Sequence, residues 1–175
     1  SFDLYTTTGT DNHREVVHDI FLTLHRNGYV YTDTMRQAYC SKDQRFLPDR
    51  YVDGTCPHCG YTAARGDQCD KCGKPLNVED LIDIRCRLCG TTPEFRNSEH
   101  FFFKLSVFQE ALLEWVRKQE HWRSNARNFT LRYLEEGLKD RAISRDLSWG
   151  VPLPVDGYES KRIYVWFEAV IGYLS

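Results

Sequence analysis

The sequence predicts an α/β protein that carries a metal-binding insert. Apolar side chains repeat at helical spacing in residues 10–27, as they do in an amphipathic helix. Three Cys-x-x-Cys-Gly runs then fall within residues 56–90, and residues 163–167 form a continuous apolar run. Such a run is typical of a strand buried on both faces of a parallel sheet. A chain that leaves the sheet, forms the cysteine-rich segment and returns to the sheet accounts for all three features.

The first predicted element is the helix over residues 10–27. Val16 and Ile20 lie on one face at helical spacing. Gly28 is a suitable stop, because glycine readily adopts the left-handed conformation that ends many helices. A short strand is expected at residues 29–31. The residues that could cap the start of the helix are Thr10, Asp11 and Asn12.

The second half of the chain is expected to return to helices and strands. Residues 101–105 indicate a buried strand, and residues 106–119 and 126–138 indicate helices with apolar stripes. We expect the aromatic residues of these stripes to lie in the core. They include Trp115, Phe129 and Tyr133.

The seven cysteines are distributed as three pairs and one single residue. Each pair is followed by a glycine, which allows the tight turn that points backbone N–H groups at the thiolates of a zinc knuckle. The odd count and the lack of a visible secretory segment argue against a disulfide framework. Thiols of this kind indicate a reducing, cytoplasmic location. The pairs are Cys56/Cys59, Cys69/Cys72 and Cys86/Cys89, and the single residue is Cys40.

The spacing of the first two pairs predicts a structural zinc site. Nine residues separate Cys59 from Cys69, enough for a loop that closes a tetrahedral site of four thiolates. Iron also accepts tetrahedral sulfur and is the alternative metal. The expected ligands are Cys56, Cys59, Cys69 and Cys72.

A second site is predicted from the remaining cysteines. Cys40, Cys86 and Cys89 supply three thiolates, whereas a structural zinc ion needs four ligands. Asp43 stands where the second cysteine of a pair would follow Cys40, and a carboxylate can bind zinc. In the alternative, Asp43 only begins a turn and the second site is weak or empty.

Composition argues against two classes of function. The formal net charge of −2 is not that of a polycation that coats nucleic acid, and no apolar run approaches the length of a membrane span.

Residues 40–90 are rich in glycine, aspartate and cysteine but poor in periodic apolar residues. This segment cannot bury enough apolar surface to fold unaided, so we expect metal binding to supply its folding energy.

Six runs of the sequence form a series with a family resemblance. They are Arg45-Phe46-Leu47-Pro48-Asp49-Arg50-Tyr51-Val52, Gly54-Thr55-Cys56-Pro57-x-Cys59, Arg65-Gly66-Asp67-Gln68-Cys69-x-x-Cys72-Gly73, Ser98-Glu99-His100-Phe101-Phe102, Ile143-Ser144-Arg145-Asp146-Leu147-x-Trp149-Gly150 and Tyr164-Val165-Trp166-Phe167-x-Ala169-x-Ile171-Gly172-Tyr173. In this order they resemble the methionyl-tRNA synthetase family over most of the chain. The long knuckle region and the Leu-x-Trp-Gly stretch look more like archaeal and eukaryotic cytosolic members than single-knuckle bacterial ones.

The resemblance implies a class I aminoacyl-tRNA synthetase with a Rossmann-type catalytic domain and a connective peptide inserted between its halves. Residues 1–32 would end the first half, residues 33–104 would form the zinc-knuckle insert, and residues 105–175 would re-enter the second half. The implied reaction is ATP-dependent activation of methionine to an adenylate, followed by transfer to the cognate tRNA. The implied cofactor is zinc, and the implied partners are methionine, ATP and tRNA, with no membrane.

The resemblance also implies roles for four residues. Trp166, Ala169 and Tyr173 match positions that line the methionine pocket, and aromatic walls suit a thioether. Arg145 matches an arginine associated with the active site, where a guanidinium suits the charge at the α-phosphate. The ordinary alternatives are a Trp166 in the core of the sheet and an Arg145 in a surface ion pair.

The chain is expected to be an inactive fragment of such an enzyme. It contains no His-Ile-Gly-His-like run and no Lys-Met-Ser-Lys-Ser-like loop, the class I signatures whose groups stabilise charge on the triphosphate. The alternative function is a zinc-ribbon module that binds nucleic acid. Basic residues near the knuckles support it, namely Arg65, Lys71, Lys74, Arg85 and Arg87.

Overall fold

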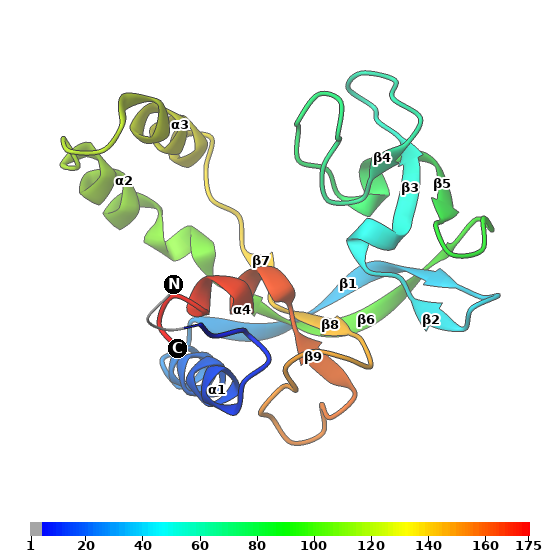
Figure 1. The fold of residues 1–175 in the computed structure, drawn as a ribbon, viewed down its shortest axis with the longest axis horizontal. Helices are drawn as coiled ribbons and strands as arrows, with labels where there is room; N and C mark the ends of the chain where they lie inside the picture. Colours follow the sequence, from blue (N-terminus) through cyan, green and yellow to red (C-terminus); the bar gives the residue numbers. More distant parts are fainter. Residues whose placement is uncertain (1–4) are drawn as a thin grey trace. The chain divides into compact units, whose positions relative to one another are not determined.

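The computed structural model describes residues 5–175, in which helices and strands are mixed along the chain (Figure 1). The α-helices are α1 (Asp11–Arg26), α2 (Gln109–Arg117), α3 (Ser124–Glu135) and α4 (Val165–Ile171). The strands are β1 (Val30–Cys40), β2 (Arg45–Phe46), β3 (Val52–Thr55), β4 (Ala64–Arg65), β5 (Ile82–Cys86), β6 (Glu94–Phe103), β7 (Arg141–Ala142), β8 (Ser144–Asp146) and β9 (Lys161–Ile163). Short 3-10 turns are η1 (Asp49–Tyr51), η2 (Val78–Asp80) and η3 (Leu105–Phe108).

The chain divides into two units. One is Thr34–Glu99, and the other combines the residues up to Asp33 with His100–Ser175. Strands β1 and β6 have residues in both units, and they belong to a four-stranded sheet of order β2-β1-β6-β7. The other sheets have the orders β4-β3-β5 and β8-β9. The pairs β1–β2, β3–β4, β3–β5, β6–β7 and β8–β9 are antiparallel, so none of them is the expected parallel pairing.

The predicted N-terminal helix is confirmed as α1. Thr10 is its cap, because the Thr10 side chain accepts a hydrogen bond of 3.2 Å from the backbone N–H of His13. Gly28 follows the helix with a φ of 76°, a left-handed conformation that glycine adopts without steric cost. Val17 and Phe21 are fully buried on its inner face. They join Phe101 and Ile163 in one core cluster, so α1 anchors the core of this unit.

The prediction of a strand at residues 163–167 is wrong. Strand β9 ends at Ile163, and helix α4 begins at Val165. Trp166 is 58% exposed, whereas Ile171 is buried and Phe167 packs at the edge of the same core cluster. Buried positions four residues apart are the signature of a helix, and a short apolar run does not reveal which period it will follow.

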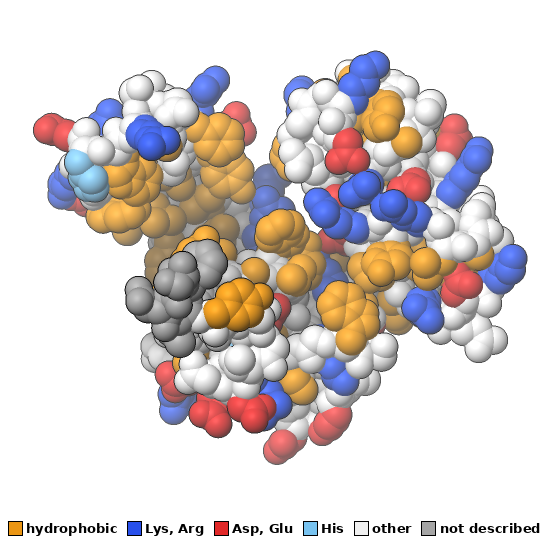
Figure 2. All heavy atoms as spheres, in the orientation of Figure 1, with side chains coloured by type: hydrophobic (Ala, Val, Ile, Leu, Met, Phe, Trp, Pro, Cys, Tyr) orange, Lys and Arg blue, Asp and Glu red, His pale blue; other side chains and the backbone are white. Residues whose placement is uncertain are grey.

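The predicted helices over residues 106–119 and 126–138 are confirmed as η3 with α2 and as α3, but their aromatic stripes are not core. The small core between α2 and α3 consists of Leu113, Val116 and Leu134. Figure 2 shows hydrophobic side chains on the surface of this helical hairpin. The exposed ones include Trp115, Phe129 and Tyr133.

Across residues 5–175, we find no helix with the length and apolar character needed to cross a membrane.

Candidate metal centres and active-site residues

Cysteine side chains form much of the core of the Thr34–Glu99 unit. Its core cluster has ten buried residues, and Cys40, Cys56, Cys69 and Cys86 are four of them. Each is the first cysteine of its run. The second cysteines are nearer the surface: Cys59 and Cys72 are exposed and Cys89 is half-buried. Thiols therefore make up as much of this core as the larger aliphatic side chains Leu47, Val52, Leu76 and Leu81.

The three Cys-x-x-Cys-Gly runs adopt the same backbone turn. In the first, the Gly60 N–H donates to the Cys56 carbonyl at 3.0 Å, and the Cys56 N–H donates to the Tyr61 carbonyl at 2.8 Å. The runs beginning at Cys69 and Cys86 repeat both hydrogen bonds. The three glycines have φ values between 71° and 75°. This is the turn that the sequence predicted, and it aims the thiols of each run at one point.

The first cluster contains Cys56, Cys59, Cys69 and Cys72, whose sulfur atoms all lie within 4.8 Å of one another. The Sγ–Sγ distance is 3.9 Å from Cys56 to Cys72 and 3.6 Å from Cys59 to Cys69. Zinc–sulfur bonds of about 2.3 Å in a tetrahedron place the sulfurs about 3.8 Å apart. The four thiols therefore fit a tetrahedral metal ion.

The second cluster contains Cys40, Asp43, Cys86 and Cys89, again within 4.8 Å. Asp43 Oδ2 lies 3.1 Å from Cys40 Sγ and 3.3 Å from Cys86 Sγ. Cys40 Sγ is 3.4 Å from Cys89 Sγ. The Thr91 hydroxyl lies 3.0 Å from Cys89 Sγ, where it can hydrogen-bond to that sulfur. Three thiols and one carboxylate thus converge as the sequence predicted.

The segment from Cys40 to Arg45 repeats the form of the knuckle turn with two substitutions. Cys40 and Arg45 are directly opposed in the β1–β2 pairing, and in the other turns a backbone hydrogen bond joins the first and sixth residues. Gln44 has a φ of 50° and stands where the other runs have glycine. Asp43 stands at the second cysteine position, and its N–H donates to Cys40 Sγ at 3.4 Å. Sequence reasoning placed Asp43 but missed Gln44, because glutamine carries no signal for positive φ.

Hydrogen bonding and burial prepare the two clusters differently for a cation. Backbone N–H groups, chiefly that of Cys72, lower the pKa of Cys69 to about 7. Thiol donors, chiefly Cys40, lower the pKa of the Asp43 carboxyl. Burial raises the pKa of Cys86 to about 12. A buried thiol of this kind becomes a thiolate only when a positive charge compensates it, which a bound divalent ion would supply.

Arg145 lies in β8 and is only 9% exposed, so it is not the surface residue that the alternative supposed. Its Nη1 donates to the carbonyls of Ala142 and Ser144, at 3.1 Å and 2.9 Å. Its guanidinium carbon lies 3.8 Å from the centre of the Tyr164 ring. Tyr164 occupies the N-cap position of α4, so the guanidinium stacks on the residue that precedes that helix.

The three residues matched to the methionine pocket lie on or just after α4. Trp166 belongs to the first turn of the helix and its side chain is largely exposed, so it is not core of a sheet. Ala169 is half-buried on the same helix. Tyr173 follows the helix and is almost fully exposed. The structure thus places Arg145 against Tyr164, the residue before α4, and Trp166 within that helix, whereas Tyr173 is 93% exposed.

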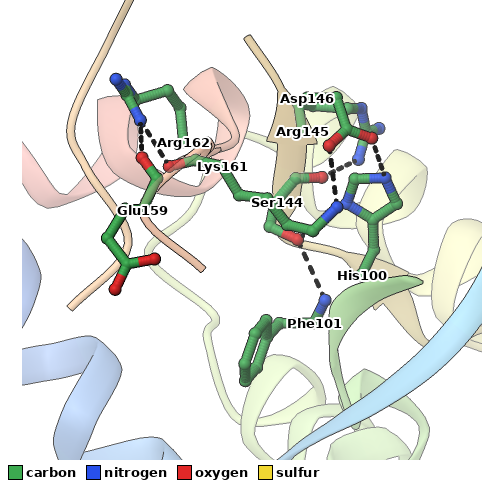
Figure 3. A network of polar contacts seen from close by, with 8 residues as sticks. All are labelled: His100, Phe101, Ser144, Arg145, Asp146, Glu159, Lys161 and Arg162. Carbon is green, nitrogen blue, oxygen red and sulfur yellow. Dashed lines mark hydrogen bonds and ion pairs between the residues drawn. The ribbon is translucent and has the colours of Figure 1, made fainter. Parts of the chain in front are cut away.

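A buried polar network beside Arg145 was not predicted from the sequence (Figure 3). His100 from β6 contacts Ser144 and Asp146 of β8, and Asp146 also contacts Lys161 of β9. His100 and Ser144 are fully buried. The only available signal was a histidine in front of the apolar run Phe101–Phe103, which alone does not identify its partners.

The fold and the cysteine clusters define an α/β protein that contains a unit organised as metal knuckles. The sequence profile described as "tRNA synthetases class I (M)" matches residues 1–175. The chain belongs to this family, the methionyl-tRNA synthetases among the class I enzymes.

Relatives in several organisms resemble the whole chain. A methionine–tRNA ligase of Dehalococcoides mccartyi is 64% identical over 175 residues, and one of Thermomicrobium roseum is 59% identical over the same length. One of Thermoplasma acidophilum is 49% identical. The expected likeness to archaeal and eukaryotic cytosolic members rather than bacterial ones is not borne out by these relatives. The chain spans about a third of each relative's length, 32%, 30% and 32% respectively.

A solved structure shares the fold. Mycobacterium tuberculosis methionyl-tRNA synthetase in complex with methionyl-adenylate aligns with 99% of this chain and 30% of its own, with a TM-score of 0.63 and 23% identity. The likeness establishes the mixed α/β fold of the Rossmann-like catalytic domain, and the two cysteine clusters are compatible with a knuckle insertion. Nothing in these comparisons favours the zinc-ribbon alternative.

Proposed function

We propose that this chain is the zinc-knuckle insert and the adjoining catalytic segments of a methionine–tRNA ligase. The observation that carries the proposal is the family match over residues 1–175, joined to two four-ligand clusters in the Thr34–Glu99 unit. In this proposal residues 1–32 end the first half of the catalytic domain. Residues 33–104 form the insert, and residues 105–175 re-enter the second half.

The whole protein would activate methionine with ATP and then transfer the methionyl group to its cognate tRNA. Activation forms a bond between the methionine carboxylate and the α-phosphate of ATP, with pyrophosphate as the leaving group. The partners of the protein are then methionine, ATP and tRNA for methionine, and its location is the cytoplasm. A buried guanidinium is suited to the negative charge that develops on the phosphate during this step, and Arg145 is our catalytic assignment.

Trp166, Ala169 and Tyr173 are our assignments for the methionine side chain. Trp166 and Tyr173 have exposed aromatic side chains that a ligand can contact, and Ala169 is a small, half-buried residue between them in the sequence. Sulfur–aromatic contacts are favourable by about 0.3–1.5 kcal/mol. These residues would select a thioether without contributing to the chemistry.

Both cysteine clusters are proposed to hold zinc. Cys56, Cys59, Cys69 and Cys72 offer four thiolates at tetrahedral spacing, and Cys40, Asp43, Cys86 and Cys89 offer three thiolates and a carboxylate. Zinc bound there would supply cohesion to the Thr34–Glu99 unit. A complete set of four protein ligands leaves no open position for a substrate, so we assign neither site a catalytic role.

The test is methionine-dependent ATP–pyrophosphate exchange by the whole protein. We expect exchange in the wild type, loss of kcat in R145A, and a raised KM for methionine in W166A with a smaller change in kcat. The 175-residue chain alone should show no exchange, since it lacks both class I ATP-binding signatures. A whole protein that binds zinc but catalyses no exchange with methionine would overturn the proposal. Elemental analysis of the same sample separates zinc from iron.

A further inference from the structure

One imidazole connects the two residues that flank Arg145. Successive side chains of a strand point to opposite faces, so Ser144 and Asp146 share one face of β8 and Arg145 takes the other. The His100 ring reaches both: Nδ1 lies 2.9 Å from Ser144 Oγ, and Nε2 lies 3.1 Å from Asp146 Oδ2. Figure 3 shows this bridge together with Lys161. His100 therefore spans two alternate positions of the strand that carries Arg145.

The bridge is closed on both sides by further contacts. The backbone N–H of Phe101 donates to Ser144 Oγ at 3.0 Å. Lys161 Nζ donates to Asp146 Oδ1 at 2.8 Å, and Lys161 is directly opposite Asp146 in the β8–β9 pairing. His100 and Ser144 are fully buried, and Lys161 is nearly so. Water cannot easily replace a lost contact in such a network, so removing one partner leaves buried polar groups unpaired.

The contacts also assign the proton of the imidazole. Ser144 Oγ already accepts a hydrogen bond from Phe101, so its own hydroxyl proton can point to Nδ1 of His100. Nε2 then carries the ring proton and faces the Asp146 carboxylate, in a contact too bent for an ideal hydrogen bond. Burial lowers the pKa of His100, which favours the neutral ring. Within the network the Asp146 carboxylate then faces the Lys161 ammonium.

On the opposite face, the Arg145 guanidinium depends on the position of β8. It stacks on Tyr164 and donates to the carbonyls of Ala142 and Ser144. The Tyr164 N–H in turn donates to the Ile143 carbonyl at 2.8 Å, so the start of α4 is tied to the residue preceding β8. A shift of β8 would move the guanidinium relative to α4, the helix of Trp166 and Ala169.

We propose that His100 is a positioning residue for Arg145: it holds Ser144 and Asp146 in place and thereby fixes the guanidinium at the start of α4. The inference rests on the proposed function, in which Arg145 acts on the activation of methionine. A displacement of about 1 Å in a catalytic group can cost about a hundredfold in rate. Loss of the bridge should therefore lower kcat while the binding of methionine and ATP is largely retained.

Three variants of His100 in the whole protein separate its two contacts. Asparagine places an acceptor near the position of Nδ1 and can keep the Ser144 contact, whereas glutamine places a donor near Nε2 and can keep the Asp146 contact. Alanine keeps neither. In ATP–pyrophosphate exchange we expect kcat to fall by about tenfold to a hundredfold in H100A and less in H100N and H100Q, with KM values within about twofold of wild type.

The matched control is L134A, which removes a buried side chain from the α2–α3 core and leaves β8 and its network untouched. It should lower thermal stability and leave kcat per active site unchanged. Suppose that R145A is inactive. If H100A then keeps the wild-type kcat, or loses only the activity that its unfolded fraction explains, as in L134A, the role of His100 is overturned and the proposed function stands. If R145A keeps full activity, Arg145 has no catalytic role, and the inference about His100 is overturned as well. A wild-type protein without exchange overturns the proposed function as well.

Discussion

Asp43 Oδ2 lies 3.3 Å from Cys86 Sγ, although the two residues are 43 positions apart in the chain. The carboxylate stands where a fourth thiolate would complete the second cluster. The two clusters consequently differ in one ligand. The first offers four soft sulfur donors, and the second replaces one of them with a harder oxygen of the same charge. We therefore expect the two metal sites to be unequal in affinity.

Substitution of Asp43 should change the second site alone. D43A removes one of four ligands, so the zinc content of the purified chain should fall from two ions towards one, as measured by elemental analysis. D43C restores a full thiolate set, so the second ion should become harder to remove with a chelator. With cobalt in place of zinc, D43C should also gain sulfur-to-metal charge-transfer absorption.

D53A is the control for Asp43, because Asp53 lies in β3 outside both clusters. It should leave two ions per chain. A D43A protein that keeps both ions with unchanged affinity would show that the carboxylate is not a ligand and that Asp43 only closes the turn.

Gln44 and Gly73 each follow the second ligand position of a knuckle turn, and substitutions at these two positions should change the stability of the chain in opposite directions. Gln44 and Gly73 have φ values of 50° and 72°, and a left-handed conformation costs a residue with a side chain about 1–2 kcal/mol. Q44G should therefore stabilise the chain by about 1 kcal/mol or less, since glycine also loses more entropy on folding. G73A should destabilise it by about 1–2 kcal/mol.

Chemical denaturation of the zinc-loaded chain measures the stability of both the Gln44 and the Gly73 variants. A Cβ at Gly73 would meet no atom within 4 Å, so the cost in G73A is one of backbone conformation and not of steric overlap. Equal stability of G73A and wild type would contradict a rigid knuckle turn at this position.

Local patterns in the sequence were sufficient for the cysteine clusters. Ligand spacing within a knuckle is short, and a thiol–thiol–glycine run has few other uses, so both sets of four residues could be assembled before the structure. Helix α1 was predictable for the same reason, since its cap, apolar face and final glycine all lie within one segment.

The errors arose where a distant contact decides the outcome. Residues 163–167 have no strongly polar residue to reveal a period. The core that buries Ile163 and Ile171, with Phe167 packed against it, selects a helix from Val165. The aromatic residues of α2 and α3 were assigned to the core, yet Leu113, Val116 and Leu134 occupy it. The His100 network joins residues 44 and 46 positions apart, and no local rule predicts such pairs.

The fully buried His100 should make stability depend on pH in a defined window. Burial lowers its pKa in the folded state below the ordinary value of about 6.5, so the unfolded chain binds the proton more readily. The contribution of neutral His100 to the free energy of unfolding is fully present above about pH 6.5. It is lost as the pH falls through the lower pKa that His100 has in the folded chain. Denaturant midpoints of the wild type should therefore decrease between about pH 7 and pH 5.

H100Q isolates this contribution, because glutamine does not titrate. Acid protonates metal-bound thiolates in both proteins, so the quantity to compare is the difference in stability between wild type and H100Q at each pH. As the pH falls, the wild type should lose more stability than H100Q. Parallel curves for the two proteins would mean that His100 has the same proton affinity in the folded and unfolded chains.

Metal removal should unfold the Thr34–Glu99 unit before the rest of the chain. Cysteines are four of the ten buried residues in its core cluster, so without a metal ion a large part of this core consists of thiols that nothing links to one another. Binding of a structural zinc ion contributes about 10–16 kcal/mol, which equals or exceeds the net stability of about 5–15 kcal/mol of a typical folded protein. After chelation, hydrogen exchange monitored by mass spectrometry should lose protection in β3, β4 and β5 first. Helix α1, with Val17 and Phe21 in a separate core cluster, should keep its protection, and added zinc should restore the strands. Retained protection of β3–β5 in the metal-free chain would show that these cysteines pack as ordinary buried thiols.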